Sequence, residues 1–193
     1  MQAARGASLT GDFLPLEGRP RFGLILGVAA SAWLLDVGTK VLAVHQLADR
    51  GPVDVIGSVL RLNLTRNPGA AFSTGTGLTP WITLFGVGAF VVAVVVARRV
   101  RNPVWASAMG LLLAGIAGNL TDRMIREPGP LRGHVVDFIE LPHWPIFNVA
   151  DICINVAAGL IVLQSLRGVP MAGRSAGPTA DHDQDEEPRG MTP

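Results

Sequence analysis

Charged side chains are scarce in this chain, and cysteine is almost absent. Asp, Glu, Lys and Arg make up 16% of the 193 residues, whereas an average soluble domain has about 25%. The deficit is uneven, because the charges lie in short segments separated by long apolar runs. A formal net charge of +1 indicates neither a nucleic-acid partner nor an acidic one. The single cysteine, Cys153, excludes an intramolecular disulfide, and without a nearby histidine it is typical of a packing residue rather than a nucleophile.

Four apolar runs are long enough to cross a bilayer, which takes about 17 to 25 predominantly apolar residues. The sequence predicts spans at residues 22–44, 80–97, 104–120 and 147–166. Trp81, Trp105 and Trp144 stand near the starts of spans, where indole rings favour the headgroup region. Ala114 and Gly118 are four apart in the third span, which permits close helix contact in lipid. We therefore expect an all-α membrane protein with four transmembrane helices.

The distribution of arginine predicts how the spans are oriented. Arg98, Arg99 and Arg101 form a dense basic turn between the second and third spans. With four spans, this turn shares one side of the membrane with both termini, and the positive-inside rule assigns that side to the cytoplasm. Several arginines also lie on the opposite side, so the density of the turn decides the orientation. A cleavable signal peptide ending at Ala32 is the competing interpretation, but the apolar run continues beyond it and the leader contains acidic residues.

Three regions are expected along the chain. Residues 1–21 and 167–193 are predicted to be cytoplasmic tails, the second of them acidic and disordered. Residues 22–166 form the predicted four-helix membrane domain. Its extracytoplasmic segment 45–78 contains SVLRLNLT, in which leucine alternates with polar residues as in a half-buried strand, and VDVI, the expected hairpin partner. A small extracytoplasmic β-sheet should therefore accompany the helices.

Polar side chains gather at one level of the predicted bundle. A charge inside the bilayer is costly, so such groups usually face the bundle interior and mark function. The predicted topology places these residues near the outer interface: Asp36, Lys40, Asn67, Asn119, Asp122, Arg123, Asp137, Asn148 and Asp151. Structural roles are the alternative for most of them. Asp36 and Lys40 could form only an intrahelical ion pair, Asp122 and Arg123 could be ordinary interface residues, and the asparagines, Asn155 included, could form interhelical hydrogen bonds.

Asp137 and Asp151 are the hardest to explain as structural residues. Asp137 lies between Val136 and Phe138, and Asp151 lies in an apolar helix with no basic residue in reach on that helix. Two carboxyl groups brought together in a low-dielectric site share one proton, because two adjacent negative charges repel strongly. The ionised one can then activate water, and the protonated one can donate to the carbonyl oxygen and the leaving amine. The residues favour an intramembrane aspartyl hydrolase, with a non-catalytic four-span ion or proton-coupled transporter as the alternative.

Other hydrolytic chemistries lack their residues. The four histidines form no H-E-x-x-H pair, so the ligands of a zinc protease are missing. No G-x-S-x-G nucleophile turn is present. Ser73 and Lys40 have the residue types of a Ser-Lys dyad, but nothing in the sequence brings them together.

Five short motifs, taken in chain order, resemble those of one family. DVGTK (36–40), NPGAAFS (67–73), GNLTDR (118–123), VVDF (135–138) and FNVAD (147–151) are similar to motifs of the lipoprotein signal peptidase (signal peptidase II) family. Each motif is short, but five in order at the predicted helix ends are specific. The resemblance covers residues 22–166. Val37 and Ile152 depart from residues that are common in the family.

The resemblance implies a bacterial enzyme of the cytoplasmic membrane that removes the signal peptide from diacylglyceryl-modified prolipoproteins, cutting before the lipidated cysteine. It implies four transmembrane helices, an extracytoplasmic β-cradle and an aspartic catalytic pair, Asp137 and Asp151. The implied substrate-binding and supporting residues are Asn67, Gly69, Asn119, Asp122, Arg123, Asn148, Asp36 and Lys40. No cofactor or metal is expected. The expected partners are the prolipoprotein, membrane lipid and an inhibitor of the globomycin type, and a monomer suffices for this mechanism.

Overall fold

The computed structural model describes residues 20–69 and 78–172. Most of the two predicted tails and residues 70–73 of the NPGAAFS motif lie outside the described residues. Within the described part, four helices and three strands follow the order α1, β1, β2, α2, α3, β3 and α4.

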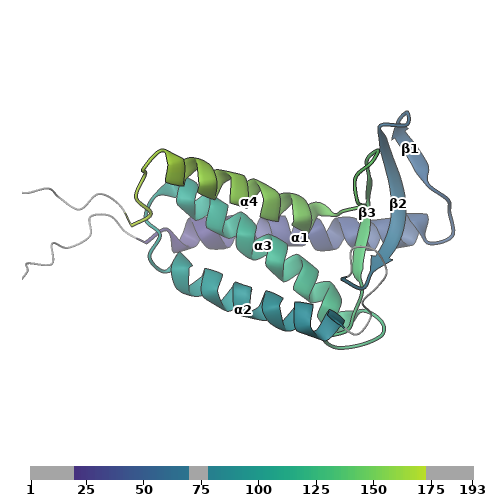
Figure 1. The fold of residues 1–193 in the computed structure, drawn as a ribbon, viewed down its shortest axis with the longest axis horizontal. Helices are drawn as coiled ribbons and strands as arrows, with labels where there is room; N and C mark the ends of the chain where they lie inside the picture. Colours follow the sequence, from purple (N-terminus) through teal and green to yellow (C-terminus); the bar gives the residue numbers. More distant parts are fainter. Residues whose placement is uncertain (1–19, 70–77, 173–193) are drawn as a thin grey trace, which may run out of the picture.

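Four helices run along the length of the molecule (Figure 1). Each is long and apolar enough to cross a membrane: α1 (Phe22–Leu47), α2 (Thr79–Ala97), α3 (Pro103–Ile125) and α4 (Val149–Leu166). The four predicted spans are confirmed, with corrections at their ends. Helix α1 continues to Leu47, beyond the predicted end at Val44. Helix α3 continues beyond the predicted end at Leu120, because its polar last turn has buried partners. Helix α4 begins at Val149 instead of Phe147, because Asn148 is its N-cap residue.

Both ends of the described chain meet the α2–α3 turn at one end of the bundle (Figure 1). The backbone N–H of Arg21 donates to the Val100 carbonyl at 3.2 Å, and the backbone N–H of Arg101 donates to the Met171 carbonyl at 3.0 Å. Because this end carries Arg21, Arg98, Arg99, Arg101 and Arg167, we call it the arginine end.

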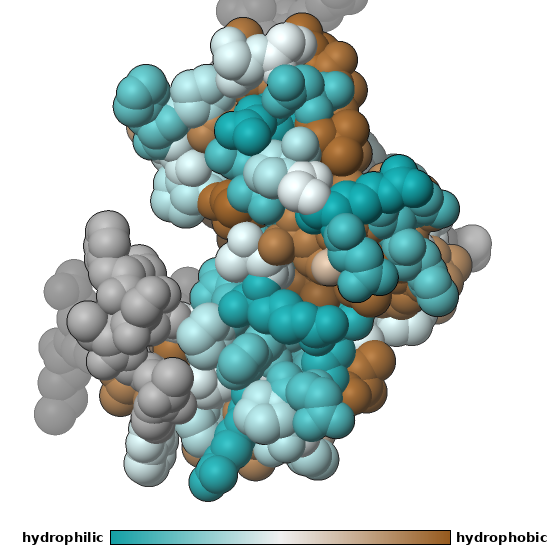
Figure 2. Space-filling model, turned by 90° about the vertical axis from the view of Figure 1, so that its right-hand side faces the viewer, coloured by the Kyte–Doolittle hydropathy of each residue, from teal (hydrophilic) through white to brown (hydrophobic). Residues whose placement is uncertain are grey.

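A three-stranded antiparallel sheet lies across the opposite end of the helices (Figure 1). Its strands are β1 (Val53–Ile56), β2 (Leu60–Asn67) and β3 (Val135–Glu140), in the order β1-β2-β3. The predicted hairpin of VDVI with the leucine-alternating strand is confirmed. Leu62 and Leu64 of β2 pack against a buried cluster that contains Val136 and Phe138. Viewed from the sheet end, the surface is mainly hydrophilic and hydrophobic atoms show at its flanks (Figure 2).

Helix α3 packs against each of the other three helices. Two glycines of α3 allow the closest approaches, as small residues do between membrane helices. A Cβ atom on Gly115 would lie 2.5 Å from the carbonyl oxygen of Ala150 in α4, and one on Gly118 would overlap the Asp36 carboxylate of α1. The polar residues of α1, α3 and α4 therefore meet at the sheet end of the bundle.

Candidate active site

Asp137 is carried into the bundle by the edge of the sheet. It is the third residue of β3, and its backbone is paired with that of Thr65 in the neighbouring strand β2. Its side chain is buried at 2% exposure, and both carboxylate oxygens accept hydrogen bonds from amide side chains. Asn67 Nδ2 donates to Oδ2 at 2.9 Å, and Asn148 Nδ2 donates to Oδ1 at 2.6 Å.

The surroundings of Asp137 favour its protonated form more than water does. Burial raises the pKa of this carboxyl to about 6, and the nearby Asp151 carboxylate adds to the rise. The amide donors of Asn67 and Asn148 and the charge of Lys40 act in the opposite direction, because they stabilise the ionised form. Desolvation is the largest of these effects, so Asp137 keeps its proton to a higher pH than an exposed aspartic acid does.

Asp151 stands in the first turn of α4, three residues after the N-cap Asn148. Asn148 Oδ1 accepts a hydrogen bond from the Asp151 backbone N–H at 3.1 Å, and Asp151 Oδ2 accepts one from the Asn148 backbone N–H at 3.2 Å. This reciprocal pair is a capping box. The second carboxylate oxygen, Oδ1, accepts a hydrogen bond from Asn119 Nδ2 at 2.8 Å. The polar start of FNVAD thus has a local structural cause, and the carboxylate is held at the helix N-terminus.

Asp137 and Asp151 line one pocket of about 420 Å³ between the sheet and α4. Asn67 and Asn155 contribute amides to its wall, and Trp144, Ile152 and Val156 contribute apolar surface. Asn155 is exposed, and its Nδ2 donates to the Asp151 carbonyl at 2.9 Å. The structure therefore brings together two acids that are separated in sequence and come from different elements.

A buried ionic network lies behind this pocket. Lys40 Nζ, fully buried, is 2.8 Å from Asp36 Oδ2, 3.0 Å from Asp122 Oδ2 and 3.1 Å from Asn119 Oδ1. The Asp36–Lys40 pair is thus more than the intrahelical pair that the sequence suggested, because it joins α1 to α3. Asp122 is buried as well, so the alternative of an ordinary interface residue is wrong for it.

The carboxylates of this network also hold backbone groups of the elements that carry the two acids. Asp36 Oδ1 accepts a hydrogen bond from the Ala150 backbone N–H at 2.8 Å, next to Asp151 in α4. Asp122 Oδ2 accepts one from the Val136 backbone N–H at 3.1 Å, next to Asp137 in β3. A single network therefore fixes both acids through their chain neighbours. Arg126, the outer member of this network, forms an ion pair with Asp122. Arg126 was not among the site residues predicted from the sequence, although its i, i+4 spacing from Asp122 indicates such a pair on a helix.

Gly69 and Arg123 lie together beside Asn67. The Gly69 backbone N–H donates to Asn67 Oδ1 at 2.8 Å, which orients the amide that faces Asp137. Gly69 has φ +99°, a backbone conformation that favours glycine, and a Cβ there would also lie 2.9 Å from Arg123 Nη2 and displace that guanidinium. Arg123 is buried and its Nη1 donates to the Pro68 carbonyl at 3.4 Å, so the alternative of an ordinary interface residue is wrong for it as well.

Comparison with known proteins identifies related sequences and folds. The family model described as signal peptidase (SPase) II matches residues 28–167. A lipoprotein signal peptidase of Mycolicibacterium smegmatis is 48% identical over 154 residues, which cover 80% of this chain and 66% of that protein. One of Mycobacterium avium is 47% identical over 160 residues, which cover 82% and 88%.

Two solved structures of bacterial membrane enzymes share the fold. One superposes with a TM-score of 0.70 at 26% identity and covers 79% of this chain and 99% of its own. The other has a TM-score of 0.67 at 25% identity and covers 78% and 92%. The four helices and the sheet are therefore the arrangement of a known class of membrane enzyme.

Proposed function

The chain belongs to the signal peptidase II family, and from this premise we propose that it is an aspartic endopeptidase whose catalytic pair is Asp137 and Asp151. Signal peptidase II activity and a multi-pass location in a bacterial membrane come with the family, and the relatives do not favour a transporter. One observation carries the proposed pair: Asn148 contacts both acids, with Nδ2 2.6 Å from Asp137 Oδ1 and its backbone nitrogen 3.2 Å from Asp151 Oδ2.

The two acids have different surroundings, which supports different roles. Asp137 is the proposed proton donor, because burial raises its pKa to about 6. Asp151 is the proposed base, because two N–H donors and the N-terminus of α4 stabilise a negative charge there. Ionised Asp151 takes a proton from water as the water oxygen bonds to the scissile carbonyl carbon. Asp137 donates its proton to the carbonyl oxygen, which gives a tetrahedral diol. As the C–N bond breaks, Asp151 passes the proton it took from water to the leaving amine, and Asp137 recovers a proton from a diol hydroxyl, so both acids return to their starting states.

The proposed substrate is a diacylglyceryl-modified prolipoprotein that is cut before its lipidated cysteine. Ile152 and Val156, on the exposed face of α4, extend the pocket along the helix, where a signal peptide in the membrane can lie beside Asp151. An inhibitor of the globomycin type would occupy the same pocket. Both acids come from one chain, so a monomer suffices, and the mechanism uses no cofactor.

We infer an orientation in which the arginine end faces the cytoplasm. The described residues of that end include five arginines and no acidic residue, in agreement with the positive-inside rule. The sheet and the two acids then lie near the outer face. A site near the outer face suits a substrate whose signal peptide spans the membrane, because the bond to be cut lies at the outer end of that peptide.

The proposed pair is tested with the purified full-length protein and a diacylglyceryl-modified prolipoprotein. Asp137→Asn and Asp151→Asn should each lower kcat/KM by about 10²–10⁴-fold, because each removes one acid–base step. Asp49→Asn is the matched control, since Asp49 is an exposed acid at the same end of the molecule, and it should retain the parent rate. Parent-like cleavage by either pocket variant would reject the pair.

A further inference from the structure

A second pocket lies at the other end of the bundle, between α1 and α2. Both helices pack against α3, whereas among the described residues they make few contacts with each other or none. The resulting groove has a volume of about 500 Å³, and α3 forms its floor with Leu113, Ala114 and Ala117. It shares no lining residue with the pocket of the two acids.

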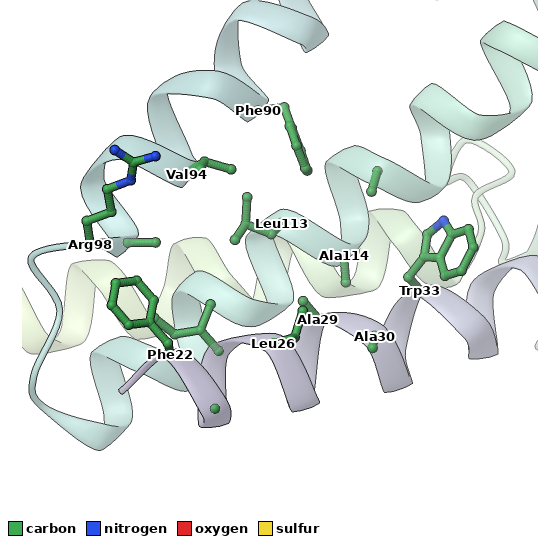
Figure 3. Close-up of a pocket in the computed structure, with 14 residues that line it drawn as sticks. Phe22, Leu26, Ala29, Ala30, Trp33, Phe90, Val94, Arg98, Leu113 and Ala114 are labelled. Carbon is green, nitrogen blue, oxygen red and sulfur yellow. The ribbon is translucent and has the colours of Figure 1, made fainter. Parts of the chain in front are cut away.

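The groove is long, and its wall is almost entirely apolar. Phe22 and Arg98 stand at one end and Trp33 stands at the other, with Leu26, Ala29 and Phe90 between them (Figure 3). Along α1, the distance from Phe22 to Trp33 is about 16 Å at the helical rise per residue. These dimensions fit an extended hydrocarbon chain that lies along the helices, and small side chains at Ala29 and Ala30 leave room for it.

Among the residues that the structure describes, Arg98 is the only charged one in the lining, and it lies at the arginine end. Its side chain is exposed, and within residues 20–69 and 78–172 the structure gives it no ion pair or hydrogen bond. The neighbouring charges, Arg99 and Arg101, are also positive. A guanidinium at the mouth of a hydrocarbon-shaped groove is complementary to a phosphate joined to an acyl chain.

We propose that this groove binds one acyl chain of an anionic glycerophospholipid, with the lipid phosphate against Arg98. Arginine near a membrane surface attracts anionic headgroups, and the groove gives the attached chain a fixed place between α1 and α2. The lipid would be drawn from the leaflet at the arginine end. The site is separate from the proposed peptidase chemistry and does not depend on it.

Trp33 reports directly on occupancy, because it lines the far end of the groove. The full-length protein is placed in detergent micelles and titrated with phosphatidylglycerol that carries brominated acyl chains, or with phosphatidylcholine that carries the same chains. Bromine quenches tryptophan at contact, and the share due to Trp33 is the difference between the parent and Trp33→Phe. We expect saturable quenching of Trp33 by phosphatidylglycerol at concentrations where phosphatidylcholine quenches much less.

Two pairs of variants separate the headgroup contact from the chain contact. Arg98→Ala should weaken the phosphatidylglycerol titration about fivefold, as expected for one arginine near the surface. Arg99→Ala, which removes the same charge from a residue outside the groove, should change it much less. Ala30→Phe should fill the groove and abolish the saturable quenching, whereas Ala158→Phe on the exposed face of α4 should leave it intact.

Three outcomes would overturn the proposal. Equal quenching by the two brominated lipids would mean that the groove takes any hydrocarbon chain. Equal effects of Arg98→Ala and Arg99→Ala would mean that only the general surface charge matters. Quenching of Trp33 by a brominated lipopeptide substrate that phosphatidylglycerol does not displace would assign the groove to the substrate. None of these readouts depends on cleavage, so they are independent of the roles of Asp137 and Asp151.

Discussion

Asn148 shows how much one residue can connect in this fold. Its side-chain nitrogen donates to Asp137 and, at 3.2 Å, to Asn119 Oδ1. Its side-chain oxygen and backbone nitrogen complete the cap on α4. A fully buried amide with all of these partners fixes the orientation of both acids, because an unpaired buried polar group would be costly.

Asn67 offers a direct test of the proposed proton donor. Its amide lowers the pKa of Asp137, so Asn67→Ala should raise that pKa above about 6. The protonated acid is the proposed active form, and activity should therefore fall on the alkaline side as Asp137 ionises. In Asn67→Ala this alkaline limb of kcat/KM should move to higher pH, while Asn63→Ala on the same strand should leave it in place. An unshifted limb in Asn67→Ala would contradict the assignment of Asp137 as the acid.

Lys40 and Arg61 allow buried and exposed charge to be compared. Lys40→Met leaves two buried carboxylates, Asp36 and Asp122, without their shared cation, and we expect a loss of about 3–5 kcal/mol in the free energy of unfolding. Arg61 pairs with Asp54 at 3.0 Å but is 37% exposed, so Arg61→Ala should cost at most about 1 kcal/mol. Thermal unfolding in detergent measures both variants. Similar melting temperatures would show that the buried network contributes little to stability.

The elements themselves could largely be predicted from the sequence. Apolar runs long enough to cross a bilayer predicted the four helices, and the alternating leucines of residues 60–65 predicted a strand. Both patterns depend on the local order of residues. Helix ends were less accurate. The last turn of α3 looks too polar for a membrane span until Asp122 is seen to pair with Lys40, which lies 82 residues earlier in the chain. Asn148 and Asp151 were treated as two residues of one helix face, although their spacing also fits a cap.

The candidate site could be predicted only at the level of the bundle end. Topology put Asp36, Asp137 and Asp151 near one interface, but it could not specify that Asp36 binds the Ala150 backbone or that Asn148 contacts both proposed catalytic acids. Such contacts depend on side-chain placement across elements that are far apart in sequence. The apolar groove beside Arg98 had no sequence signal, because it results from the separation of α1 and α2 on α3.

Gly115 gives an element-scale prediction about the α3–α4 contact. In Gly115→Ala, the new Cβ would lie 2.5 Å from the Ala150 carbonyl, so α4 must move away and take Asp151 with it. We expect a loss of about 1–3 kcal/mol in stability and a lower kcat. Gly159→Ala on α4 is the matched control, because its Cβ would meet nothing within 4 Å. If Gly115→Ala melts and cleaves like Gly159→Ala, then the close approach of these helices has no functional importance.

The whole molecule has two chemically different ends, which makes its orientation testable. In a Cys153→Ser background, Ser58→Cys labels the β1–β2 turn at the sheet end and Arg99→Cys labels the α2–α3 turn at the arginine end. Any outer barrier of the cells is first permeabilised, while the cytoplasmic membrane is left intact. A membrane-impermeant maleimide should then modify only the Ser58→Cys variant. Labelling of Arg99→Cys alone would reverse the inferred orientation.

The ion pair of Asp36 with Lys40 has a consequence for the order in which the protein is made. Translation delivers α1 well before α3, since Lys40 and its acceptor Asn119 are 79 residues apart. At a synthesis rate of about 5–20 residues per second, α1 waits on the order of ten seconds for these partners. Throughout that interval the nascent helix carries a cation whose sole neutralising group is one turn away in the same helix. A lysine paired within its own helix can enter the lipid early, keep Asp36 as its partner, and gain Asp122 and Asn119 when α3 arrives.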